Sequence, residues 1–157
     1  MTSFIEKEIG SEQTIGSYTF TADEIIQFAR RYDPQRFHVD ADAASRSNFG
    51  ALCASGWHTV SIWMKLNVQS LSTATQNAAT RNEVLPVFGP SPGFDNMKWL
   101  KPVFPGDTLR YTRTLQEIRA LNSRPGWSMM SLRCAAYNES GECVMEFDSK
   151  AMIKLPQ

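Results

Sequence analysis

Residues 55–68 decide the fold, and they begin Ser55-Gly56-Trp57-His58-Thr59. The apolar residues that follow recur at the three- and four-residue spacing that places side chains along one face of a helix: Val60, Trp63, Met64 and Val68. We therefore expect a central helix that starts near Ser55 and Gly56, with Trp63 and Met64 in the core. Such a helix cannot bury its apolar face alone, so the rest of the chain must supply a second layer.

From Phe94 onward apolar residues recur at every second position, which is typical of strands with one solvent-exposed face. Apolar and charged side chains alternate between Cys143 and Lys154, and similar alternation marks Met130 to Ala136 and Leu109 to Leu115. The turns between these segments are rich in proline, glycine and asparagine: Pro105-Gly106-Asp107, Arg124-Pro125-Gly126 and Asn138-Glu139-Ser140-Gly141. The pattern predicts at least four strands in an antiparallel meander, curled around the helix. The fold class is α+β.

The first half of the chain carries shorter elements. Residues 14–20 form a strand candidate, and Thr21 with Glu24 makes a capping box that predicts a helix from about Ala22 to Tyr32. Residues 33–38 are expected to form an irregular loop, and residues 39–44 one short helical piece. The stretch from Leu71 to Pro92 is polar and small, then rich in proline and glycine, which favours a long surface excursion and a potential lid.

Length and composition are those of one globular domain spanning residues 1–157, with 42% hydrophobic residues. Sixteen basic and sixteen acidic residues cancel, and no basic run indicates a nucleic-acid or membrane-surface partner. Cys53, Cys134 and Cys143 are odd in number and lack metal-site spacing, so we expect reduced thiols and a cytoplasmic protein. The first eight residues contain no signal-peptide apolar run, and no stretch reaches transmembrane length.

One pair of residues stands out as chemically capable. Asp33 lies five residues before His38, one of only two histidines in the chain. A histidine can exchange a proton near neutral pH, and a carboxylate beside it can orient the ring and share a water molecule. Pro34 disfavours a helical Asp33, so a functional loop is one interpretation. The other is a helix-terminating turn in which His38 is a half-buried spacer, and these residues alone favour neither.

Three features together resemble one family, the MaoC-like dehydratases and (R)-specific enoyl-CoA hydratases, which have the hot-dog fold. The features are the Asp33…His38 spacing, the helix start Ala54-Ser55-Gly56, and the run from Gly93 to Asp107. The resemblance covers nearly the whole chain. Asp33 and His38 fall on the catalytic positions of the family's motif, whereas Gln35, Arg36 and Phe37 depart from its usual asparagine, proline and aliphatic residue. Ser55 stands where many relatives have histidine.

The resemblance implies a single hot-dog domain and a hydro-lyase mechanism. Asp33 and His38 would hold one water, which adds to C3 of a trans-2-enoyl-CoA while a proton reaches C2; the reverse reaction dehydrates a 3-hydroxyacyl-CoA. The backbone N–H of Gly56 would stabilise charge on the thioester oxygen, and Ser55 would bind substrate or cap the helix. No metal or separate cofactor is implied, because coenzyme A belongs to the substrate. The partner would be a second copy, as a homodimer or dimer of dimers.

Other interpretations stay open at this stage. A hot-dog thioesterase would share the fold and the thioester pocket, and an acyl-CoA-binding subunit could keep the fold without activity. His58 suits either a pocket wall or a structural histidine with its hydrogen bonds satisfied. Asp95 and Asn96 lie in the family-like run without an assigned chemistry, and Asp107 is most simply a turn residue.

Overall fold

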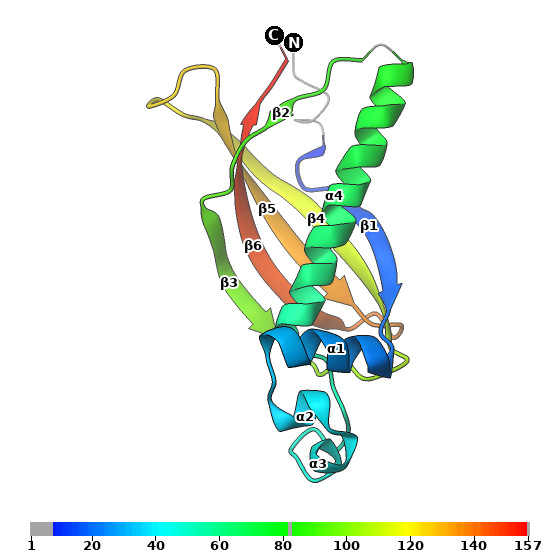
Figure 1. The fold of residues 1–157 in the computed structure, drawn as a ribbon. Helices are drawn as coiled ribbons and strands as arrows, with labels where there is room; N and C mark the ends of the chain where they lie inside the picture. The colour runs from blue at the N-terminus through cyan, green and yellow to red at the C-terminus, as the bar shows by residue number, and fades with distance from the viewer. Residues whose placement is uncertain (1–7, 82, 157) are drawn as a thin grey trace.

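The computed structural model describes residues 8–81 and 83–156. The N-terminal residues 1–7, where no signal peptide is expected, lie outside the described part of the chain. Four helices and six strands are present among the described residues (Figure 1). In chain order they are β1 (Glu12–Thr19), α1 (Ala22–Tyr32), α2 (Arg36–Val39), α3 (Ala41–Ser45), α4 (Gly56–Thr80), β2 (Val87–Phe88), β3 (Gly93–Trp99), β4 (Thr108–Ala120), β5 (Ser128–Tyr137) and β6 (Cys143–Lys154).

Helix α1 begins and ends where the sequence predicts. The Thr21 hydroxyl accepts from the backbone N–H of Glu24, and the Glu24 carboxylate accepts from the backbone N–H of Thr21, so the capping box is complete. Ile25 and Ala29 on its inner face are fully buried. The helix stops at Asp33, whose N–H closes the last turn on the Ala29 carbonyl, because Pro34 cannot follow a helical residue without a clash.

Helix α4 is longer than predicted. It starts at Gly56 with Ser55 as its N-cap, as expected, but it runs for 25 residues to Thr80. The prediction of a surface excursion from Leu71 is therefore wrong for residues 71–80. Alanine and glutamine are good helix formers, and the hydroxyls of Thr73 and Thr75 donate to carbonyls one turn earlier in the helix. The polar composition of this segment reflects exposure, not irregular backbone.

The strands form one antiparallel sheet that curls around α4 (Figure 1). Its order is β1-β4-β5-β6-β2, and β3 also pairs with β6. Strands β4, β5 and β6 are the predicted meander, but β3, which precedes them in the chain, pairs with β6 and not with β4. The segment between β3 and β4 contains Pro102 and Pro105, which cannot donate to a ladder. It crosses under the helix layer instead, where the N–H of Ala54 donates to the carbonyl of Val103 at 2.8 Å.

The core lies between α4 and the concave face of the sheet. Trp63 is 2% exposed, donates its indole N–H to the Thr112 carbonyl at 2.9 Å, and packs edge-on against Phe147. Met64, predicted to be a core residue, is 53% exposed and lies on the opposite side of the helix. The prediction for Met64 is wrong, because the buried face of α4 is formed by His58, Thr59, Ile62 and Trp63. Met64 lies one further step around the helix, outside this face.

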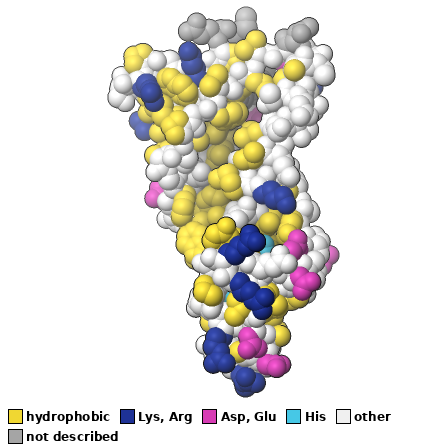
Figure 2. All heavy atoms as spheres, viewed as in Figure 1, with side chains coloured by type: hydrophobic (Ala, Val, Ile, Leu, Met, Phe, Trp, Pro, Cys, Tyr) yellow, Lys and Arg dark blue, Asp and Glu magenta, His cyan; other side chains and the backbone are white. Residues whose placement is uncertain are grey.

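One side of the molecule keeps an unusual number of exposed apolar side chains. Figure 2 shows hydrophobic side chains gathered along the middle of the viewed face, over the region of α4 and β3. The large apolar side chains that are exposed on α4, β2 and β3 and just after β3 are Trp57, Met64, Val68, Val87, Phe88, Phe94, Trp99 and Leu100. None of the helices in the described part of the chain is both long and apolar enough to cross a membrane.

The role of Trp63 gives a stability prediction. Trp63→Phe removes part of a buried ring and the donor to Thr112, so we expect the free energy of unfolding to fall by about 1–3 kcal/mol. Met64→Ala, one residue along the same helix, should change it by no more than about 0.5 kcal/mol because the side chain is exposed. Urea unfolding followed by circular dichroism measures both. Equal losses in the two variants would contradict the placement of the core.

Candidate active site

Asp33 is fixed at the C-terminal end of α1. It is the C-cap residue, and its side chain is 16% exposed. The chain turns sharply at Pro34, because the N–H of Gln35 donates back to the carbonyl of Asp33 at 2.8 Å, the bond of a γ-turn. The turn brings the next residues back over the end of the helix and toward the Asp33 carboxylate.

His38 does not lie in an irregular loop, as the sequence predicts, but in the short helix α2. This helix forms because the γ-turn leaves Gln35 in the extended conformation of an N-cap, and the N–H of His38 donates to the Gln35 carbonyl. The ring is 6% exposed and its Nε2 lies 3.5 Å from Oδ2 of Asp33. His38 is thus buried rather than half-buried, and its side chain meets that of Asp33.

The backbone fixes the tautomer of His38. Its Nδ1 lies 2.7 Å from the carbonyl oxygen of Cys53. A carbonyl only accepts, so Nδ1 carries the hydrogen of this bond. In the neutral ring Nε2 then has a lone pair, and it faces a carboxylate oxygen that also only accepts. A small donor with two hydrogens, such as water, satisfies both groups at once.

Ser55 has two partners. Its hydroxyl donates to Oδ2 of Asp33 at 2.6 Å and accepts from the backbone N–H of Trp57 at 3.2 Å. The capping role considered for Ser55 is therefore present, and the same oxygen ties the start of α4 to the end of α1. Ser55 is fully buried, so this contact is shielded from water.

The Asp33 carboxylate is held in its charged form. Burial raises the pKa of Asp33, but the hydrogen bonds from Ser55 and Gln35 lower it, and so does the positive charge of His38 when its ring is protonated. The lowering contributions outweigh burial, so the net pKa lies below the ordinary value. Asp33 is ionised at neutral pH and can act as a hydrogen-bond acceptor and base.

Gly56 lines the same cavity as Asp33 and His38, a space of about 480 Å³ whose walls are largely apolar and include Phe37, Phe49, Trp57, Trp99 and Val103. As the first residue of α4, Gly56 has a backbone N–H without an intrahelical partner. A Cβ at this position would overlap with the indole of Trp99. Glycine is thus required for close packing, and a role for its N–H is compatible with that requirement.

Cys53 is a neighbour that sequence reasoning did not single out. Its Sγ lies 3.6 Å from Nδ1 of His38. Burial raises the pKa of the Cys53 thiol to about 11, with a further contribution from the charge of Asp33. The thiol is protonated at neutral pH, so it is not an activated nucleophile. The contribution of Cys53 is its backbone carbonyl, which no sequence pattern reveals.

His58 is neither a pocket wall nor a satisfied structural histidine. Its ring is 4% exposed, stacks on Phe28 at 4.5 Å with an interplanar angle of 5°, and meets Phe20 edge-on. Within the described residues its Nδ1 has no hydrogen-bond partner. Burial lowers the pKa of His58 to about 4, although the charge of Glu24 opposes this. The neutral ring serves as an aromatic contact between α1 and α4.

The burial of His58 predicts acid sensitivity. In the unfolded chain His58 takes up a proton at its ordinary pKa of 6.5, whereas in the folded protein it does so only at about pH 4. Between these two values the unfolded state binds more protons, so the free energy of unfolding falls as the pH drops from 6.5 to 4. The loss attributable to His58 should reach about 3 kcal/mol. His58→Phe keeps the aromatic stack and should lose less stability between these pH values than the unchanged protein. Identical pH profiles of urea unfolding would contradict the prediction.

Asp95, Asn96 and Asp107 lie outside this cavity. Asp107 accepts from the N–H of Phe104 at 2.8 Å, which confirms its turn role. Asn96 has a positive φ of 55° in a bulge of β3, and its side chain donates to Asp148 at 2.7 Å.

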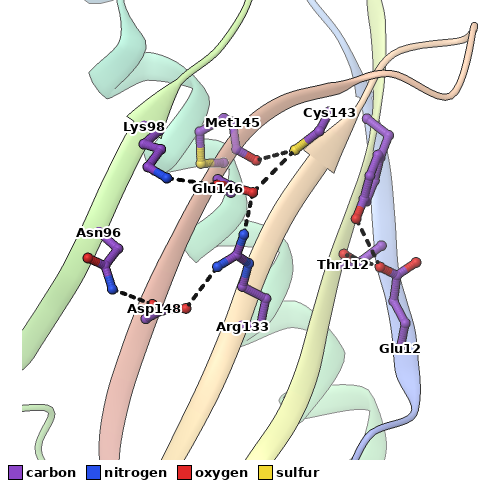
Figure 3. Close-up of polar contacts among 10 residues, drawn as sticks. Glu12, Asn96, Lys98, Thr112, Arg133, Cys143, Met145, Glu146 and Asp148 are labelled. Carbon is purple, nitrogen blue, oxygen red and sulfur yellow. Dashed lines mark hydrogen bonds and ion pairs between the residues drawn. The ribbon is translucent and has the colours of Figure 1, made fainter.

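Figure 3 shows Asn96 in a polar network across β3, β6 and β5, in which Arg133 bridges Glu146 and Asp148. Lys98 also pairs with Glu146, with 3.6 Å between Nζ and Oε1. The polar side chains drawn there pair with one another, so we assign this network to the sheet surface.

A curled antiparallel sheet wrapped on one long helix, with polar side chains gathered where that helix begins, defines a hot-dog-fold protein. The chain belongs to the MaoC-like dehydratase family: the family described as MaoC like domain matches residues 4–125. The predicted family and fold are confirmed.

The chain is also similar to individual proteins. The MaoC-like dehydratase from Rhodospirillum rubrum is 30% identical with a TM-score of 0.78, over 95% of this chain and 94% of that one. The (R)-hydratase from A. caviae shares the fold at 20% identity, with a TM-score of 0.66 over 95% of this chain and 97% of that one. The mesaconyl-CoA hydratase of Cereibacter sphaeroides is 36% identical over 62 residues, which are 40% of this chain and 18% of that protein.

Proposed function

We propose that this protein is a hydro-lyase that adds water to an enoyl-CoA, or removes it from a 3-hydroxyacyl-CoA, through Asp33 and His38. The observation that carries the proposal is the pair of acceptor atoms, Oδ2 of Asp33 and Nε2 of His38, which face each other 3.5 Å apart at an apolar cavity. Membership of the MaoC-like family supports hydratase chemistry in general. The names of two similar proteins, an (R)-hydratase and a mesaconyl-CoA hydratase, support the same class.

In this proposal Asp33 and His38 bind the same water molecule and orient it for attack. A water between Asp33 and His38 directs one hydrogen toward each acceptor, so an oxygen lone pair is free to attack C3 of the conjugated thioester. The C3–O bond forms as one O–H bond breaks, and the released proton returns to C2. Both side chains end the cycle unchanged. The substrate needs no further activation than its conjugation, provided that the negative charge on the thioester oxygen is stabilised.

Gly56 is the candidate for that stabilisation. Its free N–H lies at the start of α4, which is the positive end of the helix dipole. A hydrogen bond from this N–H would stabilise negative charge on the thioester oxygen. The absence of a side chain lets the Trp99 indole pack directly against the backbone of Gly56. Trp99 and Gly56 both line the cavity.

Variants of the pair test the proposal. Asp33→Asn removes the base but keeps the size of the side chain, and His38→Gln removes the ring; each should lower kcat/KM for enoyl-CoA hydration by about 10²–10⁴-fold. The measurement is the loss of conjugated absorbance with crotonyl-CoA and longer enoyl-CoAs. Asp42→Asn, an exposed acid on α3, is the matched control and should retain full activity.

Three results would count against the hydratase proposal. Absence of turnover across all chain lengths would exclude the simple form of the reaction. Release of free coenzyme A thiol, detected with a thiol reagent, would favour the thioesterase alternative. Acyl-CoA binding that persists while Asp33→Asn leaves every rate unchanged would favour a binding subunit.

The proposed partner, besides the acyl-CoA, is a second copy of the chain. The exposed apolar side chains along α4 and β3 include Met64, and also Trp57 and Trp99, which line the cavity. Burying them against an identical surface would remove apolar area from water. Light scattering should give twice the chain mass of 17.7 kDa, and Met64→Lys should shift the mass toward the single chain. A single-chain mass for the unchanged protein would contradict the dimer.

A further inference from the structure

One residue of the motif remains without a role in the proposed reaction. Gln35 stands where the family usually has asparagine, and its side chain is exposed at the rim of the cavity. We propose that Gln35 is a positioning residue for the hydration. Its side-chain amide binds Oδ1 of Asp33 and leaves Oδ2 for Ser55, His38 and the water. This inference rests on the proposed function.

The two oxygens of Asp33 have separate partners. Nε2 of Gln35 donates to Oδ1 at 2.8 Å, whereas Ser55 donates to Oδ2 at 2.6 Å. A carboxylate that accepts from one side only can rotate about its χ2 torsion, which is broad and nearly two-fold. Donors on both oxygens fix this torsion, so Oδ2 keeps its position 3.5 Å from Nε2 of His38.

The turn at Pro34 brings the side chain of Gln35 close to the carboxylate of Asp33. The γ-turn from Asp33 to Gln35 reverses the chain within three residues. Two residues joined by such a turn carry side chains that lie close together, and a glutamine is long enough to reach back. The contact is local and forms whenever the turn forms.

Gln35 does not use its side chain to cap helix α2. It is the N-cap of α2, yet its side chain makes no capping hydrogen bond. Asp40, the N-cap of the next helix, accepts from the N–H of Ala43 at 3.0 Å in the ordinary way. Asparagine, aspartate, serine or threonine at position 35 would be a better cap. The side chain present here is instead committed to the Asp33 carboxylate.

The contact has an electrostatic consequence. Burial raises the pKa of Asp33, and the hydrogen bonds from Ser55 and Gln35 are the next contributions, both lowering it. Within residues 8–81 and 83–156, the other titratable groups that face this carboxylate are His38 and the thiol of Cys53. Lys101 lines the same cavity but is paired with Glu142 at 2.8 Å. Removing the Gln35 donor therefore raises the pKa of Asp33, and activity should be lost at a higher pH as the solution is acidified.

Gln35→Met tests this inference, since methionine keeps the length of the side chain and lacks the donor. We expect kcat/KM for enoyl-CoA hydration to fall by about three- to tenfold near neutral pH, the effect of one ordinary hydrogen bond at an exposed position. The acid limb of the pH profile should move to higher pH. Gln35→Asn should move the limb in the same direction without lowering Tm, because the shorter amide can cap α2. Gln27→Met, on an exposed face of α1, is the matched control and should leave the profile unchanged.

A merely structural role makes a different prediction. If Gln35→Met lowers kcat/KM equally at every pH, or leaves the acid limb where it is in the unchanged protein, the inference is wrong. A lowered Tm in Gln35→Met with an unmoved limb also contradicts it.

Failure of the proposed function can be separated from failure of this inference. If the unchanged protein hydrates no enoyl-CoA, carbon-13 NMR of aspartate-labelled protein still reports the titration of Asp33, assigned with Asp33→Asn. A higher Asp33 pKa in Gln35→Met than in the unchanged protein supports the contact. Equal values overturn it, whatever the substrate.

Discussion

The hydrogen bond from Ser55 to Asp33 joins the end of one helix to the beginning of another, and the arrangement of the site depends on it. Asp33 caps the C-terminus of α1, where the helix dipole is unfavourable to a carboxylate. Ser55 caps the N-terminus of α4, where the dipole is favourable to one. The 2.6 Å contact between them places the charge of Asp33 beside the helix end that stabilises it. The unfavourable position at the end of α1 is thereby offset.

The rest of the molecule keeps these two helix ends in place. Trp63 anchors α4 to the sheet through the Thr112 carbonyl, and His58 stacks on Phe28 to hold α1 against the first turn of α4. The segment before α4 presents the Cys53 carbonyl to His38 and so fixes which ring nitrogen faces Asp33. Each anchor is buried, which gives the cavity rigid walls on the side of the polar pair.

The sequence predicted the parts of this arrangement that local chemistry determines. Thr21 and Glu24 located the start of α1, Pro34 its end, and Ser55 the start of α4. The helix from Leu71 to Thr80 could not be predicted from apolar periodicity, since most of its side chains are exposed. The partner of β3 and the exposure of Met64 depend on how distant segments pack. The contact of His38 with a backbone carbonyl and the reach of Gln35 to Asp33 depend on a turn whose geometry residue types alone do not specify.

The central claim is that Asp33 and His38 direct one water onto an enoyl thioester, and the structure of the product tests it most directly. Crotonyl-CoA incubated with the protein in deuterium oxide should give 3-hydroxybutyryl-CoA with one deuterium at C2, a new oxygen at C3 and an intact thioester, as read by NMR and mass spectrometry. Formation of free coenzyme A and crotonate, or recovery of crotonyl-CoA without deuterium or added water, would contradict the account.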